Sequence, residues 1–288
     1  MDTSGAIERL EIEAGGFTFS ARASGPHDGR RLLLLHGFPQ TSWAWRDQLS
    51  ALGRAGYRAI APDQRGYSGG ARPTEVGAYA TEHLVGDVLA LADSMEMETF
   101  DLVGHDWGGM VAWIAASRYP ARIRSLSVVS TPHPLALRRA LTGGDTAQAA
   151  TGEATASLCE PEVPERLLLG ADGSGSGLAT LLAESGLDSE DARTYVSALT
   201  EPGALTAALN WYRAMDPTAL DELQPIAVPT LYVWSTGDEA FGRRAAEGTA
   251  EHVHGPYTFE VLKDVSHWVP EMAPVELSDL LLRHLSLC

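Results

Sequence analysis

The chain has 288 residues, with 21 Lys and Arg against 38 Asp and Glu, which gives a formal net charge of −17. This length allows one large catalytic domain, or a core domain with an insertion. A chain with so large an acidic excess repels phosphate backbones and anionic membrane surfaces, so nucleic acid and membranes are not expected as partners.

The ends and the cysteines of the sequence give no sign of secretion. Residues 1–16 are charged and polar and lack the apolar core of a signal peptide. No apolar run reaches the roughly 18 residues of a membrane-spanning helix. The two cysteines are Cys159 and the last residue, Cys288, so no disulfide framework is implied. We therefore expect a cytoplasmic protein.

Strand and helix patterns alternate over the first 130 residues. Residues 10–14 and 17–23 alternate apolar and polar side chains, as in an antiparallel pair of strands. Residues 31–37 form a continuous apolar run, typical of a strand buried on both faces, and further strands are predicted at residues 57–63, 100–106 and 123–130. Helical spacing of apolar residues occurs between these runs, at residues 41–56, 80–95 and 107–120. This alternation predicts a parallel sheet with helices on both faces.

The pattern changes after the sixth predicted strand. No strand pattern occurs between about Pro132 and Asp216, where Ala, Leu, Glu and Thr dominate, and this predicts a helical insertion. Strand patterns return at residues 229–235 and 257–264, and an amphipathic helix follows at residues 274–287. We predict an α/β fold in three parts, namely the first part of a core (1–131), a helical cap (132–218) and the second part of the core (219–288).

The stretch "LVGHDWGGM", Leu102–Met110, lies between a predicted strand and a predicted helix. It places a glycine two residues before Asp106 and another two residues after it, the G-x-nucleophile-x-G spacing of a hydrolase elbow. Glycines at these positions allow the tight turn that lifts the central side chain above the sheet. The amide of Trp107 opens the helix, where it can donate to a developing oxyanion. We therefore predict that Asp106 is a nucleophile.

Two further segments supply candidate partners for Asp106. "LLLLHGFPQ" puts a loop at the end of a predicted strand, where parallel sheets build their sites, and makes the Phe38 amide the candidate second oxyanion donor. Asp238 lies just past the strand in "LYVWSTGDEA", and His267 lies in the loop past the next strand. Nucleophile, acid and histidine then follow in the order of an α/β-hydrolase, which predicts a triad of Asp106, Asp238 and His267.

A carboxylate nucleophile restricts the chemistry. A serine that attacked a saturated carbon would form an ether, which a histidine-activated water does not hydrolyse. A carboxylate forms an ester instead, and water activated by His267 can attack the Asp106 carbonyl carbon and release the alcohol. Asp238 would orient His267, while the amides of Phe38 and Trp107 would hold the oxyanion. Asp106 thus predicts displacement at a carbon–oxygen or carbon–halogen bond.

Six segments resemble the epoxide hydrolase group of the α/β-hydrolase fold superfamily: "HGFPQ", "APDQRGYS", "VGHDWGG", "ALNWYRA", "YVWSTGDEA" and "GPYTFEVLKDVSHWVPE". They occur in the family's order and extend over nearly the whole chain. Haloalkane and fluoroacetate dehalogenases share the same aspartate-nucleophile architecture. The resemblance implies an α/β-hydrolase fold with a mostly parallel central sheet and a helical cap. It also implies catalysis without a cofactor on a small epoxide or related apolar electrophile.

The resemblance further implies two cap tyrosines that donate a proton to the epoxide oxygen. Tyr212 in "ALNWYRA" matches one of them, and a phenol with a pKa of about 10 stays protonated at neutral pH. The position of the other falls near Ala154, and no tyrosine occurs between Tyr119 and Tyr195. Tyr195 is a candidate substitute, with core packing as its alternative role.

Further expectations concern substrate contacts, cofactors and alternative functions. We expect the substrate to contact Trp107, Trp211, Trp268, His36 and Pro39, with packing as the alternative role of Trp268. No H-E-x-x-H or C-x-x-C motif occurs, and the glycines near the elbow do not form G-x-G-x-x-G, so neither a metal nor a dinucleotide is implied.

A dehalogenase, a ligand-binding protein and a ring-opening enzyme of natural-product metabolism stay open as alternatives, as does a homodimer.

Overall fold

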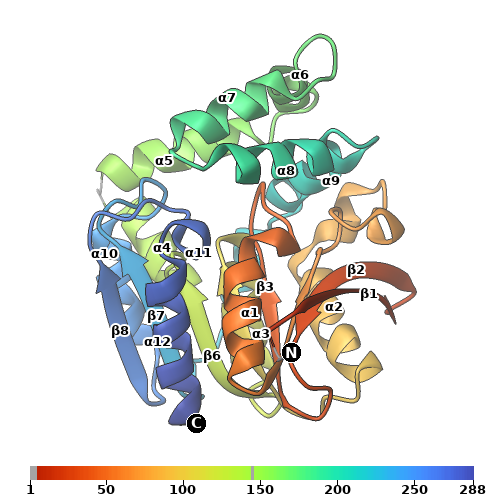
Figure 1. Ribbon diagram of the computed structural model, residues 1–288. Helices are drawn as coiled ribbons and strands as arrows, with labels where there is room; N and C mark the ends of the chain where they lie inside the picture. Colours follow the sequence, from red (N-terminus) through yellow and green to blue (C-terminus); the bar gives the residue numbers. More distant parts are fainter. Residues whose placement is uncertain (1–4, 144–145) are drawn as a thin grey trace.

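A computed structural model describes residues 5–143 and 146–288 and places eight strands in one sheet (Figure 1). The strands are β1 (Ile7–Ala14), β2 (Phe17–Ser24), β3 (Arg30–Leu35), β4 (Tyr57–Pro62), β5 (Phe100–His105), β6 (Ile123–Val129), β7 (Thr230–Ser235) and β8 (Tyr257–Leu262). Their order in the sheet is β1-β2-β4-β3-β5-β6-β7-β8. The β1–β2 and β2–β4 pairs are antiparallel, and the other neighbouring pairs are parallel. The predicted antiparallel pair and mostly parallel sheet are confirmed.

The two faces of the sheet have separate cores, which explains the continuous apolar runs of the inner strands. Successive side chains of a strand point to opposite faces. In β3, Leu32 and Leu34 belong to one buried cluster, whereas Leu33 and Leu35 belong to the other. The first cluster includes side chains of α1 (Arg46–Arg54) and α12 (Pro274–Ser286), and the second those of α2 (Thr81–Ser94) and α3 (Trp107–Arg118). A strand packed in this way has no polar face.

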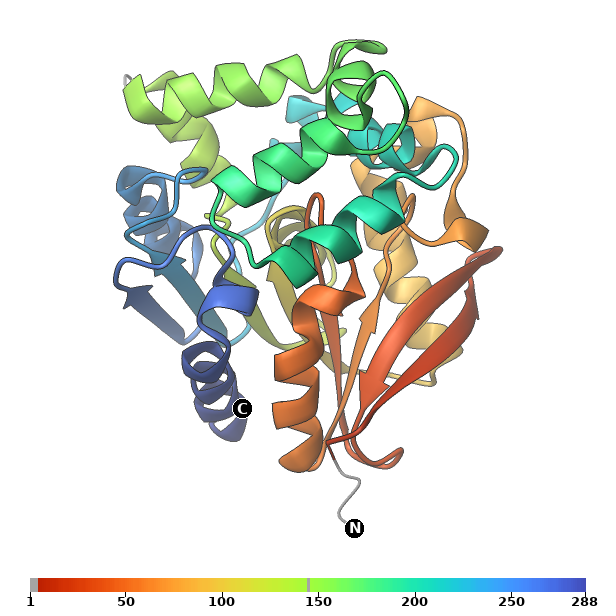
Figure 2. The same ribbon diagram turned by 45° about the horizontal axis from the view of Figure 1, so that its top comes forward.

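The chain between β6 and β7 is helical, and we call helices α4–α9 the helical insertion. They are α4 (Pro134–Thr142), α5 (Thr146–Ser157), α6 (Val163–Leu169), α7 (Ser176–Glu184), α8 (Ser189–Leu199) and α9 (Ala204–Arg213). In Figure 1 and in the turned view of Figure 2, these green helices lie across one end of the sheet. The predicted helical insertion after the sixth strand is present, whereas its role as a cap and its boundaries at residues 132 and 218 stay a prediction.

Short helices fill the connections. They are η1 (Ser42–Trp45), η2 (Gly69–Ala71), η3 (Val76–Tyr79), η4 (Pro217–Leu220), α10 (Arg243–Gly248), η5 (Thr249–His252) and α11 (Val269–Met272). The helix predicted from residue 41 begins as the 3-10 turn η1, and Thr41 caps it by accepting a hydrogen bond from the Trp43 amide at 3.3 Å. Within the described part of the chain, no helix combines the length and apolar character needed to cross a bilayer.

Polar contacts of buried side chains fasten α8 of the insertion to the core. Asp191 accepts hydrogen bonds from Trp43 Nε1 at 2.7 Å and from Arg46 at 3.0 Å. One helical turn later, the hydroxyl of Tyr195 donates to Glu271 Oε1 at 2.6 Å. Because four residues along a helix return to the same face, both side chains of α8 reach the core from one side. These contacts keep the insertion over the end of the sheet.

Candidate active site

Asp106 occupies a strained turn between β5 and α3. Its φ of 52° and ψ of −121° lie in a region that side chains other than glycine rarely adopt. A Cβ on Gly108 would lie 2.2 Å from the carbonyl oxygen of Leu35, so only a glycine lets α3 begin this close to β3. The predicted elbow is therefore present, and it lifts the Asp106 side chain beyond the C-terminal end of β5.

Backbone donors approach the Asp106 carboxylate on one side. The amide of Phe38 donates to Asp106 Oδ1 at 2.8 Å, and the Trp107 amide helps to lower the pKa of the carboxylate. Gly37 has to be a glycine at this point, because a Cβ there would lie 2.2 Å from Asp106 Oδ1. Thr131, at the end of β6, donates its hydroxyl to the Asp106 carbonyl at 2.8 Å. The Phe38 amide thus lies where a negative charge on Asp106 would need a donor, while the role of the Trp107 amide stays a prediction.

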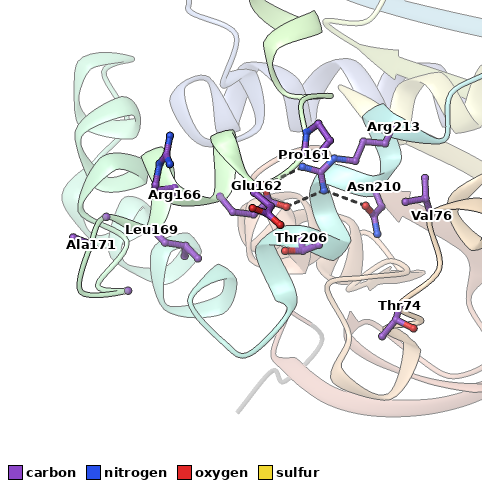
Figure 3. A pocket seen from close by; sticks show the side chains of 13 residues that line it. Thr74, Val76, Pro161, Glu162, Arg166, Leu169, Ala171, Thr206, Asn210 and Arg213 are labelled. Atoms are coloured by element: carbon purple, nitrogen blue, oxygen red, sulfur yellow. Dashed lines mark hydrogen bonds and ion pairs between the residues drawn. The ribbon is translucent and has the colours of Figure 1, made fainter.

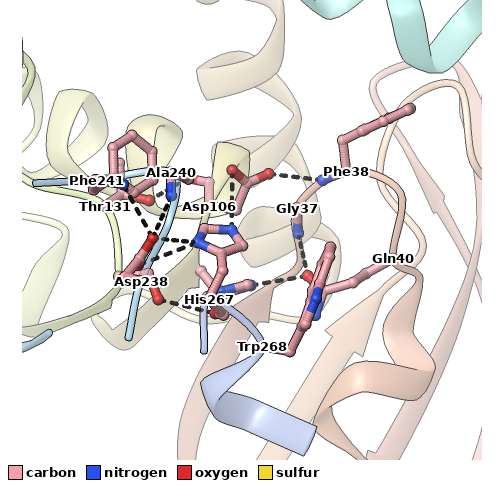
Figure 4. Close-up of polar contacts among 12 residues, drawn as sticks. Gly37, Phe38, Gln40, Asp106, Thr131, Asp238, Ala240, Phe241, His267 and Trp268 are labelled. Atoms are coloured by element: carbon pink, nitrogen blue, oxygen red, sulfur yellow. Dashed lines mark hydrogen bonds and ion pairs between the residues drawn. The ribbon is translucent and has the colours of Figure 1, made fainter. Parts of the chain in front are cut away.

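His267 lies on the other side of the carboxylate and connects it to Asp238 (Figure 4). Its Nε2 is 3.5 Å from Asp106 Oδ2, and its Nδ1 is 3.2 Å from both carboxylate oxygens of Asp238. The Asp238 side chain is fully buried and accepts hydrogen bonds from the amides of Ala240 at 2.8 Å and Phe241 at 3.0 Å. The structure therefore brings Asp106, His267 and Asp238 together in the predicted arrangement.

The charges of these three residues support one another. Burial lowers the pKa of His267, but Asp238 and the hydrogen bond to Asp106 outweigh it and raise this pKa to about 10. Burial raises the pKa of Asp106, but the hydrogen bond and charge of His267 hold it below its usual value. At neutral pH the resting site therefore contains an imidazolium between two carboxylates.

An apolar cavity of about 370 Å³ lies above Asp106, between the sheet and the insertion. It is lined by Phe38, Asp106, Trp107, Met110, Thr131, Leu137, Leu141, Gln148, Gly152, Thr155, Tyr212, Met215, Ala240, Phe241 and His267. Tyr212 on α9 stands edge-on to Trp107, with ring centroids 4.9 Å apart, and edge-on to Phe38 at 5.5 Å. Burial and the charge of Asp106 raise the pKa of Tyr212 well above its ordinary value, so its hydroxyl stays a donor.

Comparisons with known proteins agree with this geometry. The alpha/beta hydrolase fold family matches residues 30–274. The chain is 34% identical over 277 residues to AB hydrolase superfamily protein YfhM of Bacillus subtilis, with 95% of this chain and 96% of the relative covered. It is 30% identical over 317 residues to Epoxide hydrolase A of Mycobacterium tuberculosis, with 97% of each covered. The crystal structure of Epoxide Hydrolase A from Mycobacterium thermoresistibile superposes with a TM-score of 0.83 at 28% identity, covering 98% of both chains.

The chain belongs to the epoxide hydrolase group of the α/β-hydrolase fold. It is an epoxide hydrolase-like enzyme, as its sequence motifs predict.

Four of the five side chains predicted to contact substrate in this epoxide hydrolase-like site do not line the cavity. His36 and Pro39 are buried, and His36 Nε2 accepts from the Gln64 amide at 3.1 Å. Trp211 and Trp268 turn their indole nitrogens away from the cavity. Trp107 is the predicted substrate contact that does line it. The prediction of substrate contact is therefore corrected for the other four residues. The ring nitrogens of His36, Trp211 and Trp268 form hydrogen bonds with residues outside the cavity lining, and the Pro39 side chain is buried.

The second tyrosine of the epoxide hydrolase pattern has no counterpart in the described lining. Ala154 is part of α5, and its side chain lies outside the residues that the structure describes. From α5 the cavity is lined by Gly152 and Thr155. Tyr195 is fully buried, and its hydroxyl donates to Glu271 outside the cavity, so core packing is the role that the geometry favours. Among the described lining residues, Tyr212 is the sole phenol.

A larger hollow of about 730 Å³ lies on the insertion, between α6, α9 and residues 74–76 (Figure 3). Three of its polar side chains bind each other. Arg213 donates to both carboxylate oxygens of Glu165, at 2.8 and 2.9 Å, and to Asn210 at 3.2 Å. None of the predicted triad residues lines this hollow. The smaller cavity over Asp106 is therefore the candidate active site.

Three side chains near the triad were not predicted as site residues from the sequence, namely Gln40, His105 and Glu271. Gln40 Oε1 lies 2.8 Å from His105 Nδ1, and Gln40 Nε2 donates to Glu271 Oε1 at 2.6 Å. Gln40 and Glu271 do stand in the quoted segments "HGFPQ" and "SHWVPE", but nothing in the sequence shows that the two segments meet.

In the part of the chain that the structure describes, no cluster of three or more His, Cys, Asp or Glu side chains could hold a metal ion.

The pKa of His267 should respond to the charge of Asp106. In Asp106→Asn that charge is gone while the shape is kept, so the pKa of His267 should fall from its raised value of about 10. An NMR titration of labelled histidine, with the His267 signal assigned by its loss in His267→Gln, measures the change. The exposed and unrelated Asp93→Asn is the control, and an unchanged His267 pKa in Asp106→Asn would contradict the ion pair.

Proposed function

We propose that this enzyme opens an apolar epoxide to a vicinal diol through a covalent ester on Asp106. The observation that supports this best is the carboxylate itself, which stands at the elbow position beneath an apolar cavity, between the Phe38 amide and His267. A relative that is 30% identical to this chain, Epoxide hydrolase A of Mycobacterium tuberculosis, is named as an epoxide hydrolase. A carboxylate suits this chemistry because its ester, unlike a serine ether, can be hydrolysed.

In the first step, Asp106 attacks a carbon of the epoxide ring. A new bond forms between the carboxylate oxygen and the substrate carbon, and the ring carbon–oxygen bond breaks. The leaving oxygen takes the hydroxyl proton of Tyr212, which lines the same cavity as Asp106. Aromatic edges of Phe38 and Trp107 hold the Tyr212 ring in place. The products of this step are a hydroxyalkyl ester of Asp106 and a tyrosinate.

In the second step, water attacks the carbonyl carbon of the Asp106 ester. His267 removes a proton from that water, and Asp238 orients the ring and stabilises the imidazolium. The negative charge that develops on Asp106 Oδ1 falls where the Phe38 amide already donates, and the Trp107 amide is the second donor. When this intermediate collapses, the bond between the Asp106 carbonyl carbon and the substrate oxygen breaks, and the leaving alkoxide takes the proton of the new carboxyl group. This releases the diol, restores the Asp106 carboxylate and leaves His267 protonated, as in the resting enzyme. Water is the co-substrate, so no cofactor is needed.

Formation of the ester also changes His267 from an acid to a base. In the resting enzyme Asp106 and Asp238 both raise the pKa of His267, so the ring is protonated. An ester has no charge, so the contribution of Asp106 disappears once the ester forms. The tyrosinate left by ring opening can then take the His267 proton, which restores the Tyr212 phenol and leaves a neutral His267 that can activate water. We propose that this change enforces the order of the two steps.

We further propose a division of roles among the three segments of the chain. The core segments 1–131 and 219–288 supply the nucleophile, the oxyanion donors, the acid and the histidine. The cap segment 132–218 supplies Tyr212 and part of the apolar wall, namely Leu137, Leu141 and Met215. An apolar wall of this kind favours an apolar substrate.

A dehalogenase would use the same triad, and one observation speaks for it. The Trp107 side chain lines the cavity beside Asp106, where its indole N–H could bind a leaving halide. Tyr212 favours the epoxide instead, because a halide needs no proton to leave. Halide release against diol formation, measured on matched alkyl halides and epoxides, distinguishes the two activities.

Removal of the Tyr212 hydroxyl should slow ring opening. In Tyr212→Phe we expect the rate of ester formation from styrene oxide to fall about 100-fold, the usual size of a general-acid contribution. Rapid-quench mass spectrometry measures this rate. The half-exposed Tyr119→Phe is the matched control and should react as the wild type does. Equal rates in Tyr212→Phe and wild type would refute Tyr212 as the donor.

The ester itself should accumulate when hydrolysis is blocked. In His267→Gln, incubation with styrene oxide, an aliphatic epoxide or a polycyclic epoxide should add one substrate mass, which intact-protein mass spectrometry detects. The double variant Asp106→Asn/His267→Gln is the control and should gain no mass. Absence of any adduct with all three epoxide classes would contradict the proposed function.

A further inference from the structure

A buried side-chain network lies directly behind the oxyanion loop, on the side away from the cavity. Its centre is Gln40, which is fully buried. Gln40 Oε1 accepts a hydrogen bond from the Gly37 amide at 3.2 Å and lies 2.8 Å from His105 Nδ1. Gln40 Nε2 donates to Glu271 Oε1 at 2.6 Å. One amide side chain thus connects the loop after β3, the end of β5 and α11.

The contact to Gly37 matters because of the residue that follows it. The Phe38 amide donates to Asp106 Oδ1 at 2.8 Å, and the backbone of Gly37 passes so close to Asp106 that no side chain fits there. The Gln40 oxygen holds the loop from behind by its bond to the Gly37 amide (Figure 4). If the Gln40 amide turned around, an NH₂ group would face the Gly37 N–H, and this support would be lost.

Glu271 and the Gly37 amide together decide which way the Gln40 amide is turned. Glu271 Oε1 accepts hydrogen bonds and the Gly37 N–H donates one, so Gln40 presents its NH₂ to Glu271 and its oxygen to Gly37. A glutamine at position 271 would offer both an oxygen and an NH₂ group, so this contact would no longer exclude the turned orientation. The acid specifies one orientation, and an amide would not.

The buried position of Glu271 is also unfavourable for its ionised form. Glu271 Oε1 accepts from Gln40 and from Tyr195, at 2.6 Å each, whereas Oε2 is buried without a hydrogen-bond partner. The other charge that faces it is Asp191, which is paired with Arg46, and burial raises the pKa of Glu271 from 4.5 to about 7. Between these two pH values the unfolded chain is ionised while the folded one holds its proton, so stability falls as the pH rises.

We infer that Glu271 is a positioning residue for hydrolysis of the covalent ester. It fixes the Gln40 amide, which holds the Gly37 amide and thereby keeps the Phe38 N–H aimed at Asp106. This inference rests on the proposed ester mechanism. The oxyanion on Asp106 exists only while water attacks the ester, so loss of this alignment slows ester hydrolysis and leaves ester formation nearly unchanged.

Single-turnover kinetics separate the two steps. Wild-type and Glu271→Gln proteins are mixed with styrene oxide, and rapid-quench mass spectrometry follows the rise and decay of the ester. We expect Glu271→Gln to hydrolyse the ester about tenfold more slowly, with ester formation changed less than about threefold, because small displacements of a catalytic group cost rates of this order. The ester then accumulates in the variant.

Two controls isolate the Gln40 contact from the attachment of the insertion. Asp191→Asn removes the neighbouring buried acid of α8, and Tyr195→Phe removes the other donor to Glu271. Neither side chain touches Gln40, so both variants should keep the wild-type ratio of the two rates.

The double variant Gln40→Glu/Glu271→Gln exchanges the acid and the amide. It puts the acid beside Gly37, where the acid can accept hydrogen bonds from the Gly37 amide and from the amide side chain introduced at position 271. This double variant should therefore restore the rate of ester hydrolysis.

Thermal unfolding shows that slow hydrolysis does not reflect a misfolded protein. Because the glutamine removes a buried ionisable group, Glu271→Gln should unfold at a higher temperature than wild type at pH 8, with a smaller difference at pH 5. Wild-type rates of both steps in Glu271→Gln, or a parallel loss of both steps that Asp191→Asn reproduces, would overturn the role of Glu271. If the wild type itself forms no ester, the proposed function fails, and this inference falls with it.

Discussion

The rest of the site depends on one electrostatic constraint, the negative charge of Asp106 at the bottom of an apolar cavity. A buried carboxylate is unfavourable unless donors and an opposite charge surround it. The Phe38 amide and the imidazolium of His267 provide both, from opposite sides of the carboxylate. Because each side chain stabilises the charge of its neighbour, Asp238, His267 and Asp106 form one ionised unit. A change in the charge of Asp106 therefore changes the acid–base state of His267.

The fold satisfies this constraint through the geometry of a parallel sheet. Phe38, Asp106, Asp238 and His267 come from four separate segments, each of which follows a strand at the same end of the sheet. The strands are packed on both faces, so they hold these ends rigidly. The helical insertion then covers the end and supplies Leu137, Leu141 and Tyr212 to the cavity. The sheet that holds the triad and the helices that cover it are thus formed by different parts of the chain.

The sequence predicted the parts of this arrangement that depend on local order. The apolar runs located the strands, and the glycines around Asp106 located the elbow, because a tight turn has few sequence solutions. Substrate contacts were predicted less well. His36 and Trp211 stand next to site residues in the chain, yet their side chains point into the supporting walls. Gln40 and Glu271 are 231 positions apart, so only the tertiary structure shows that they touch.

The proposed mechanism requires that water attacks the ester carbonyl of Asp106 and never the substrate carbon. A single turnover in heavy-oxygen water, with enzyme in excess over epoxide, distinguishes the two routes. We expect that the diol of this first turnover contains no heavy oxygen, and that the label appears in the peptide that contains Asp106. Heavy oxygen in the first-turnover diol, with an unlabelled Asp106 peptide, would contradict it.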